Sequence, residues 1–172
     1  MTEHPPTEYP PLAPVLAVRD VSAAIGCYTR AFGGVELGRL IDPRTGRVAH
    51  AEIRLPGGPL LLLEERPRSG SEPRPEPGSE PGTDTSPGSV SPSTPGLRLC
   101  LFVADADAVT VACAAAGMQV IQPPKTHFHG HRCSLLEDPE GHQWMVSQVV
   151  EPLGIPRMQA RWDRSVSEGR HR

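Results

Sequence analysis

The two halves of this sequence repeat one order of predicted elements, and this repetition constrains the fold more than any single motif. Each half contains an apolar strand, an aspartate that precedes a helical pattern, and three further strands. Matched residues are separated by 83 to 85 positions in four pairs: Val18 and Val103, Asp20 and Asp105, Gly34 and Gly117, and Gly58 and Gly141. A nearly constant separation over so many residues indicates a duplicated structural unit.

The first unit is predicted over residues 11–65. Asp20 is a suitable helix N-cap, and apolar side chains follow it at helical spacing: Val21, Ile25, Tyr28 and Phe32. Residues 48–55 alternate between apolar and polar side chains, which is typical of a strand with one buried face. A Pro-Gly-Gly-Pro turn at 56–59 then leads into four consecutive leucines, which predict a buried strand.

The second unit is predicted over residues 97–150, with a helix that begins after Asp105 or Asp107. Pro123 and Pro124 are expected to end a strand, because proline cannot donate to a sheet ladder. The predicted elements are, in order, a strand at 97–103, a helix at 108–116, and strands at 118–122, 132–137 and 143–149. Four strands alone cannot bury both faces of a sheet. We therefore predict an α+β fold in which two β-α-β-β-β modules form a curved mixed sheet around a cleft.

Three segments lie outside these units. Residues 66–96 consist almost entirely of Pro, Gly, Ser, Thr and charged residues, which predicts a disordered linker between the modules. This linker is interpreted either as a tolerated surface insertion or as a segment that recruits a partner. Residues 1–10 are predicted to be a flexible N-terminus. The charged tail at 151–172 either forms a short helix that docks on a partner subunit or is disordered.

Composition and charge exclude several classes of partner. The formal net charge of −3 does not favour binding to nucleic acid or to an anionic membrane. No apolar run is long enough to span a bilayer, and the N-terminus lacks the pattern of a secretory signal. The four cysteines have no C-x-x-C spacing, so we expect buried free thiols in a cytoplasmic protein.

Four motifs carry a resemblance to a known family: residues 23–33, 48–53, 123–132 and 138–144. Together they resemble the vicinal oxygen chelate superfamily, which includes glyoxalase I, bleomycin- and fosfomycin-resistance proteins and extradiol dioxygenases. Within that superfamily the chain is most similar to the PhnB-like branch. The resemblance implies a small-molecule cleft that a homodimer completes. It does not imply one activity, because this fold hosts many chemistries.

The resemblance also implies a divalent metal, such as Zn, Ni, Mn or Fe, held by the first and last strands of each unit. The corresponding positions here hold Ala13, Leu62, Arg98 and Met145. Alanine and leucine have no donor atom, the arginine is a cation, and the methionine stands where metal-binding relatives carry glutamate. We therefore expect no metal centre at these positions and no cofactor, so that the protein binds its small molecule without one.

A relocated metal site is the alternative. Three histidines alternate along one short segment, so that on a strand they would share a face: His127, His129 and His131. Together with Glu64 they would supply ligands for a metal-dependent lyase, isomerase or dioxygenase. The other interpretation places these histidines at the border of the ligand cleft. His50 and Glu52 also share a strand face, either as a general base with its orienting carboxylate or as a structural pair.

Aromatic and cationic side chains of the second unit are candidates for contact with the ligand. The aromatic rings, with Met145, would form an apolar wall, and the arginines would meet an anionic group. The alternative for these residues is ordinary strand packing and surface ion pairs. The predicted ligand-binding residues are Arg98, Phe102, Phe128, His129, Arg132 and Trp144.

Overall fold

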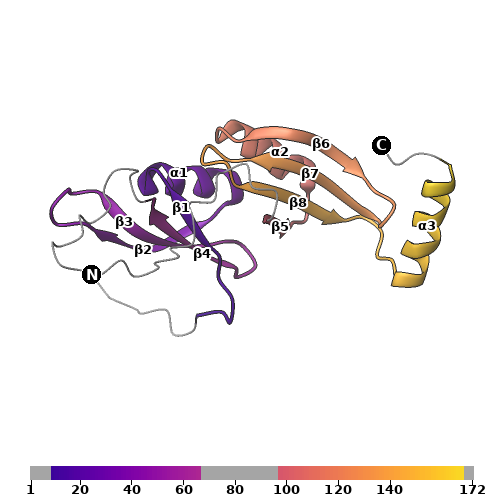
Figure 1. Ribbon diagram of the computed structural model, residues 1–172, viewed down its shortest axis with the longest axis horizontal. Helices are drawn as coiled ribbons and strands as arrows, with labels where there is room; N and C mark the ends of the chain where they lie inside the picture. The colour runs from indigo at the N-terminus through magenta and orange to yellow at the C-terminus, as the bar shows by residue number, and fades with distance from the viewer. Residues whose placement is uncertain (1–8, 67–96, 169–172) are drawn as a thin grey trace, which may run out of the picture.

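The duplicated unit predicted from the sequence is present in the structure, a computed structural model that describes residues 9–66 and 97–168 (Figure 1). The predicted linker lies outside the described residues except for Arg66, and the first eight residues lie outside them as well. The elements are, in order, β1 (Val15–Val18), α1 (Val21–Phe32), β2 (Val35–Ile41), β3 (Val48–Arg54), β4 (Leu60–Glu65), β5 (Arg98–Phe102), α2 (Ala106–Ala115), β6 (Gln119–Thr126), β7 (His131–Glu137), β8 (Gln143–Val149) and α3 (Ile155–Ser167).

Each unit forms its own four-stranded mixed sheet. The strand orders are β1-β4-β3-β2 and β5-β8-β7-β6. Strand β1 runs parallel to its neighbour β4, and β5 runs parallel to its neighbour β8. The prediction of an α+β fold built from two β-α-β-β-β modules is therefore confirmed. The two sheets are separate rather than continuous among the described strands, because the units meet through α1 and α2 (Figure 1).

The two N-caps show how closely the units repeat. Asp20 and Asp105 have nearly identical backbone angles, with φ of −140° and −141°. The Asp20 carboxylate accepts a hydrogen bond from the backbone N–H of Ala23 at 3.0 Å, and Asp105 accepts one from Ala108 at 2.9 Å. Each carboxylate satisfies a backbone donor that the first helical turn leaves unpaired, so both helices begin at a defined residue.

The halves share one core at their junction. The indole of Trp144 on β8 packs against Phe32 and Tyr28 of α1, with ring centroids 4.7 and 5.4 Å apart. The Tyr28 hydroxyl donates to the carboxylate of Asp138 at 2.6 Å, across the boundary between the units. Apolar burial and a buried hydrogen bond therefore both hold the two units together.

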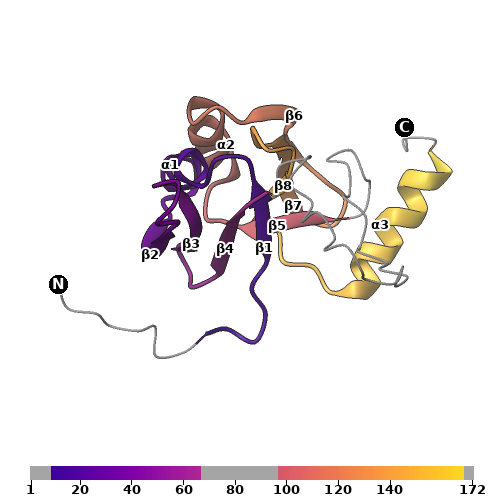
Figure 2. The same ribbon diagram turned by 60° about the vertical axis from the view of Figure 1, so that its left-hand side comes forward.

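Helices α1 and α2 cover only one face of each sheet (Figure 2). We call the uncovered side the open face. On the first sheet it is formed by Val15, Ala17, Val35, Leu40, His50, Glu52, Arg54, Leu62 and Glu64, which the strand registers place side by side. On the second sheet it is formed by Arg98, Cys100, Phe102, Lys125, His131, Cys133, Leu135, Glu137, Gln143, Met145, Ser147 and Val149.

The predicted break at the two prolines was wrong. Strand β6 continues through Pro123 and Pro124, and its pairing with β7 shifts register between Gln122 and Lys125. The prolines lie within that shift, on the edge strand of the sheet, where a missing N–H costs no ladder hydrogen bond.

The C-terminal tail and the cysteines each match their sequence prediction in part. The tail forms a helix, α3, although its docking on a partner subunit remains a prediction. All four cysteines are free thiols, but Cys100 is exposed rather than buried. Within the described parts of the chain, no helix has the length and apolar character needed to cross a membrane.

Candidate functional site

A short chain of polar side chains crosses the open face of the second sheet. The Ser147 hydroxyl lies 3.3 Å from the Cys133 thiol and 3.4 Å from Nδ1 of His131. Ser147 is only 1% exposed, so these neighbours satisfy a hydroxyl that would otherwise be costly to bury. The three side chains come from β7 and β8, which pair so that Cys133 lies opposite Ser147.

An apolar and aromatic surface surrounds this polar chain. The ring of Phe102 meets the His131 imidazole edge to face at 5.7 Å, and Phe102 is 61% exposed. Met145 lies in register between Cys100 on one side and Leu135 on the other. An exposed aromatic ring beside sulfur atoms and a few placed polar groups can hold a small organic molecule.

The open face of the first sheet carries a different set of side chains. The His50 ring lies between two carboxylates, with Nε2 3.8 Å from Glu52 and Nδ1 3.9 Å from Glu64. Tyr9 donates its hydroxyl hydrogen bond to Glu52 at 2.8 Å. This hydrogen bond to the carboxylate raises the pKa of Tyr9 above its ordinary value. The predicted His50–Glu52 pair is thus present, with two partners that the sequence did not indicate.

The three clustered histidines do not lie on one strand. Residues 127–130 form a turn, and only His131 belongs to β7. The rings still touch, because His127 and His129 stack with centroids 5.3 Å apart and His129 meets His131 at 4.8 Å. Burial lowers the pKa of both His127 and His129, and neighbouring positive groups lower each of them further.

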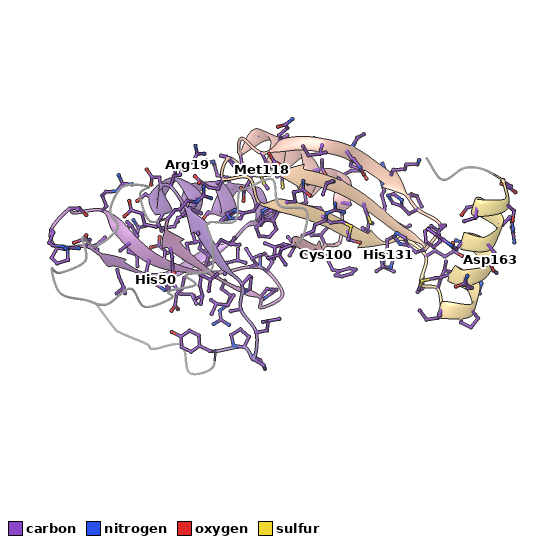
Figure 3. The ribbon with its side chains drawn as sticks, in the orientation of Figure 1. Arg19, His50, Cys100, Met118, His131 and Asp163 are labelled. Atoms are coloured by element: carbon purple, nitrogen blue, oxygen red, sulfur yellow. The ribbon has the colours of Figure 1, made fainter. Side chains whose placement is uncertain are left out.

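Glu64 does not join these histidines within the chain. Glu64 contacts His50 in the first half, whereas His131 lies in the second half (Figure 3). Among the described residues there is no group of three or more His, Cys, Asp and Glu side chains that could hold a metal ion. The relocated site of three histidines and Glu64 is therefore wrong as a site within one chain.

Two predicted ligand-binding residues lie on the covered face of the second sheet. Trp144 is 2% exposed and donates its indole N–H to Asp138 at 3.0 Å. Arg132 points to α2 and forms a two-pronged ion pair with Asp107, at 2.5 and 2.7 Å. A ligand on the open face cannot reach either side chain, because strand neighbours point to opposite faces.

The other candidates are accessible but separated from one another. Arg98 and Phe102 lie on the open face of β5, where Arg98 contacts only the Gln143 side chain, at 3.5 Å, among the described hydrogen bonds and ion pairs. Phe128 and His129 lie in the turn at 127–130, where Phe128 packs against Trp162 of α3. Sequence reasoning missed Cys133 and Ser147. Alternation along β8 places Ser147 on the face of Met145, whereas Cys133 joins that face only through the register of β7 with β8.

The donor set at the positions where the resemblance implies a metal does not fit one. Ala13 precedes β1, and Leu62 lies opposite Val15 and Glu52 on the first open face. Arg98 and Met145 occupy the corresponding places on the second. A hydrocarbon side chain, a guanidinium and a thioether do not make the oxygen and nitrogen cage that hard and borderline divalent metals require.

Comparison with known proteins agrees with this architecture. Residues 12–146 match the sequence model of the glyoxalase/bleomycin resistance protein/dioxygenase superfamily. An uncharacterized protein of Mycobacterium bovis is 33% identical over 151 residues, covering 88% of this chain and 91% of its own length. A Mycobacterium tuberculosis protein, also uncharacterized, has the same identity and covers 81% of its own length.

Solved structures show the same fold. TioX from Micromonospora sp. ML1 has a TM-score of 0.55 and 26% identity, over 80% of this chain and 97% of its own. A glyoxylase/bleomycin resistance protein/dioxygenase domain from Frankia sp. EAN1pec has a TM-score of 0.58 and 21% identity, over 84% and 95%. The chain belongs to the glyoxalase/bleomycin resistance protein/dioxygenase superfamily.

Proposed function

We propose that this protein binds a small organic molecule, without a metal ion, on the open face of its second sheet. The supporting observation is the surface that joins the exposed Phe102 ring to the polar chain of His131, Ser147 and Cys133. Apolar contacts would supply most of the affinity, and the partly exposed His131 ring, held by the buried Ser147 hydroxyl, would orient the ligand. The side chains at the family's metal positions support binding without a metal, because they do not form a suitable donor set.

We further propose that a second copy of the chain closes the site. Each open face exposes apolar side chains that would gain from burial, including Val35 (63% exposed) on the first sheet and Phe102 on the second. The faces also differ in net charge, since the first carries Glu52 and Glu64 against Arg54, and the second carries Arg98 and Lys125 against Glu137. The first face of one copy therefore complements the second face of another, and a two-fold dimer makes this contact twice.

Two finer assignments belong to the same proposal. We assign the chain to the PhnB-like branch of the superfamily, on the motifs at 23–33, 48–53, 123–132 and 138–144. We also place the protein in the cytoplasm, a compartment in which four free thiols remain reduced.

Native mass spectrometry of the full chain tests the proposal in one measurement. We expect a dimer, no stoichiometric metal, and an added mass of a few hundred daltons when a binding compound from a small-molecule library is present. Elemental analysis of the same sample checks the metal content independently. One Zn, Ni, Mn or Fe per chain would overturn binding without a metal.

Placing a charge on the open face should separate the subunits. In Phe102→Asp the new carboxylate would lose its water in the interface without a designed partner. We expect the dimer dissociation constant to rise about 100-fold, which corresponds to about 2.7 kcal/mol. Sedimentation velocity over a range of concentrations measures the change.

Val111→Asp is the matched control for that variant. Val111 is also an exposed apolar residue, but it lies on α2, away from both open faces. It should leave the dimer intact. Equal dissociation in both variants, or none in Phe102→Asp, would contradict the proposed interface.

A further inference from the structure

The turn at residues 127–130 is tied tightly to the end of β8. The Gly130 carbonyl accepts hydrogen bonds from the backbone N–H groups of Val150 at 3.0 Å and Glu151 at 2.9 Å. The backbone N–H of His127 donates to the carbonyl of His131 at 2.8 Å, which closes the turn. A change within this turn therefore acts directly on the segment that leads into α3.

Helix α3 contacts the same turn through a polar and an aromatic side chain. Arg161 donates to the Glu151 carboxylate at 2.8 Å and to the Phe128 carbonyl at 3.4 Å, and the ring of Trp162 lies 5.0 Å from that of Phe128. None of the described residues of α3 is buried. Because little apolar surface is buried, docking of this helix is a weak equilibrium that a modest change in charge can shift.

The turn contains the chain's one cluster of contacting histidines among the described residues. His127 and His129 stack with an angle of only 3° between their rings, and His129 also touches His131. When the rings are neutral, these contacts are favourable. Protonation of both stacked rings would place two like charges about 5 Å apart, in partly desolvated surroundings.

We propose that the turn at 127–130 and α3 form an acid-sensitive latch, in which protonation of His127 and His129 releases α3 from the second sheet. The latch does not depend on the ligand site or on the dimer, since all of its contacts lie within one chain. Its release would free the end of the sheet next to His131, which lies on the proposed ligand-binding face.

The charged groups around the histidines favour the neutral rings. Lys125 on β6 lowers the pKa of His127, and His131 on β7 lowers that of His129. Arg161 on α3 donates to the Phe128 carbonyl, between the two histidines in sequence. The carboxylate of Glu151 is already shared by Arg161 and Arg157, and that of Asp107 on α2 is paired with Arg132. From β5 and β8 the neighbours of His131 are the uncharged Phe102 and Ser147.

The direction of the pH effect follows from the lowered pKa values. Burial is the main cause of the low pKa of both His127 and His129, followed by Lys125 for the former and by His131 and His127 for the latter. In the proposed released state the turn would open, and the two rings, better solvated and farther apart, would bind protons more readily than in the docked state. Docking should therefore be strongest above about pH 6.5 and weaken as the pH falls below it.

NMR of the two tryptophan indoles tests the latch in the full chain. Trp162 lies on α3, and the buried Trp144 serves as an internal reference. From pH 8 to pH 5 we expect the Trp162 indole signal to move towards its position in a free peptide while the Trp144 signal stays in place. Amide hydrogen exchange of α3, corrected for intrinsic rates, should rise about tenfold for each unit of pKa difference.

Two variants of the turn and one control variant separate the latch from general acid sensitivity. His127→Gln/His129→Gln should abolish the transition above pH 5, and His129→Phe, which keeps a ring in the stack, should weaken it. His50→Gln, on the other sheet, should leave it unchanged. A Trp162 signal that is constant from pH 8 to pH 5, or an unshifted transition in the double variant when it retains wild-type circular dichroism, would overturn the proposal.

Discussion

Replacing Asp138 by alanine should destabilise the protein by about 3 to 5 kcal/mol. The Asp138 carboxylate accepts from the Tyr28 hydroxyl at 2.6 Å and the Trp144 indole at 3.0 Å, and its Oδ2 lies 3.1 Å from His142 Nδ1. The Tyr28 and Trp144 side chains are buried, so the variant leaves two donors without an acceptor at the junction of the units. Thermal unfolding should show a loss of roughly 10 °C or more.

The matched control is Asp42→Ala, in the turn of the first unit that joins β2 to β3. Asp42 accepts a hydrogen bond from the backbone N–H of Arg44, but its turn is exposed and does not join the two units. Its loss should cost about 1 kcal/mol or less. Similar losses of stability in the two variants would contradict a special role for the buried carboxylate.

The Asp138 carboxylate should also make the free energy of unfolding depend on pH in acid solution. Burial acts to raise the pKa of Asp138, but the hydrogen bonds from His142, Tyr28 and Trp144 outweigh it and hold the pKa below its ordinary value. The contribution of Asp138 to the free energy of unfolding is therefore complete above about pH 4, near its pKa in the unfolded chain. This contribution is lost as the pH falls through the lower pKa that Asp138 has in the folded protein. Asp138→Asn should remove this part of the acid dependence in urea titrations at a series of pH values.

The fold was predictable because local signals agreed with the duplication. Asp20 is an N-cap, as predicted, and of the two candidates Asp105 and Asp107 the structure selects Asp105. The alternation at 48–55 and the leucines at 60–63 became β3 and β4. The separation into two sheets was not predictable, because it depends on how α1 packs on α2, and neither helix contains a motif that specifies a partner.

The candidate site was harder to predict, since one residue of register decides which face a side chain occupies. Arg132 and Trp144 have suitable chemistry for a ligand, yet both fall on the covered face. The histidines at 127–131 were treated as a strand, but positive φ at Gly130 makes the segment a turn. Cys133 and Ser147 form the polar chain because β7 and β8 pair in one register, which no local pattern sets.

Gly130→Ala should be the most disruptive glycine-to-alanine change among the residues that the structure describes, with an expected loss of about 3 kcal/mol or more. Gly130 has φ of +80°, which by itself costs an alanine about 1 to 2 kcal/mol. A Cβ atom there would also lie 2.2 Å from the carbonyl oxygen of Glu151. That oxygen is a backbone atom of the residue whose N–H donates to Gly130, so it can move away only by a change of backbone conformation next to that hydrogen bond. Chemical denaturation measures the loss.

Gly117→Ala separates the steric contribution from the conformational one. Gly117 also has positive φ, +97°, but a Cβ atom there would meet no atom within 4 Å. It should cost only about 1 to 2 kcal/mol, so the difference between the variants reports the contact with Glu151. Because that contact lies where β8 leads into α3, Gly130→Ala should also loosen α3 at neutral pH, seen as faster amide exchange in the helix, whereas Gly117→Ala should not. Equal losses of stability in Gly130→Ala and Gly117→Ala would mean that the backbone at the end of β8 moves at little cost. The turn would then be too flexible to transmit a change in charge to α3.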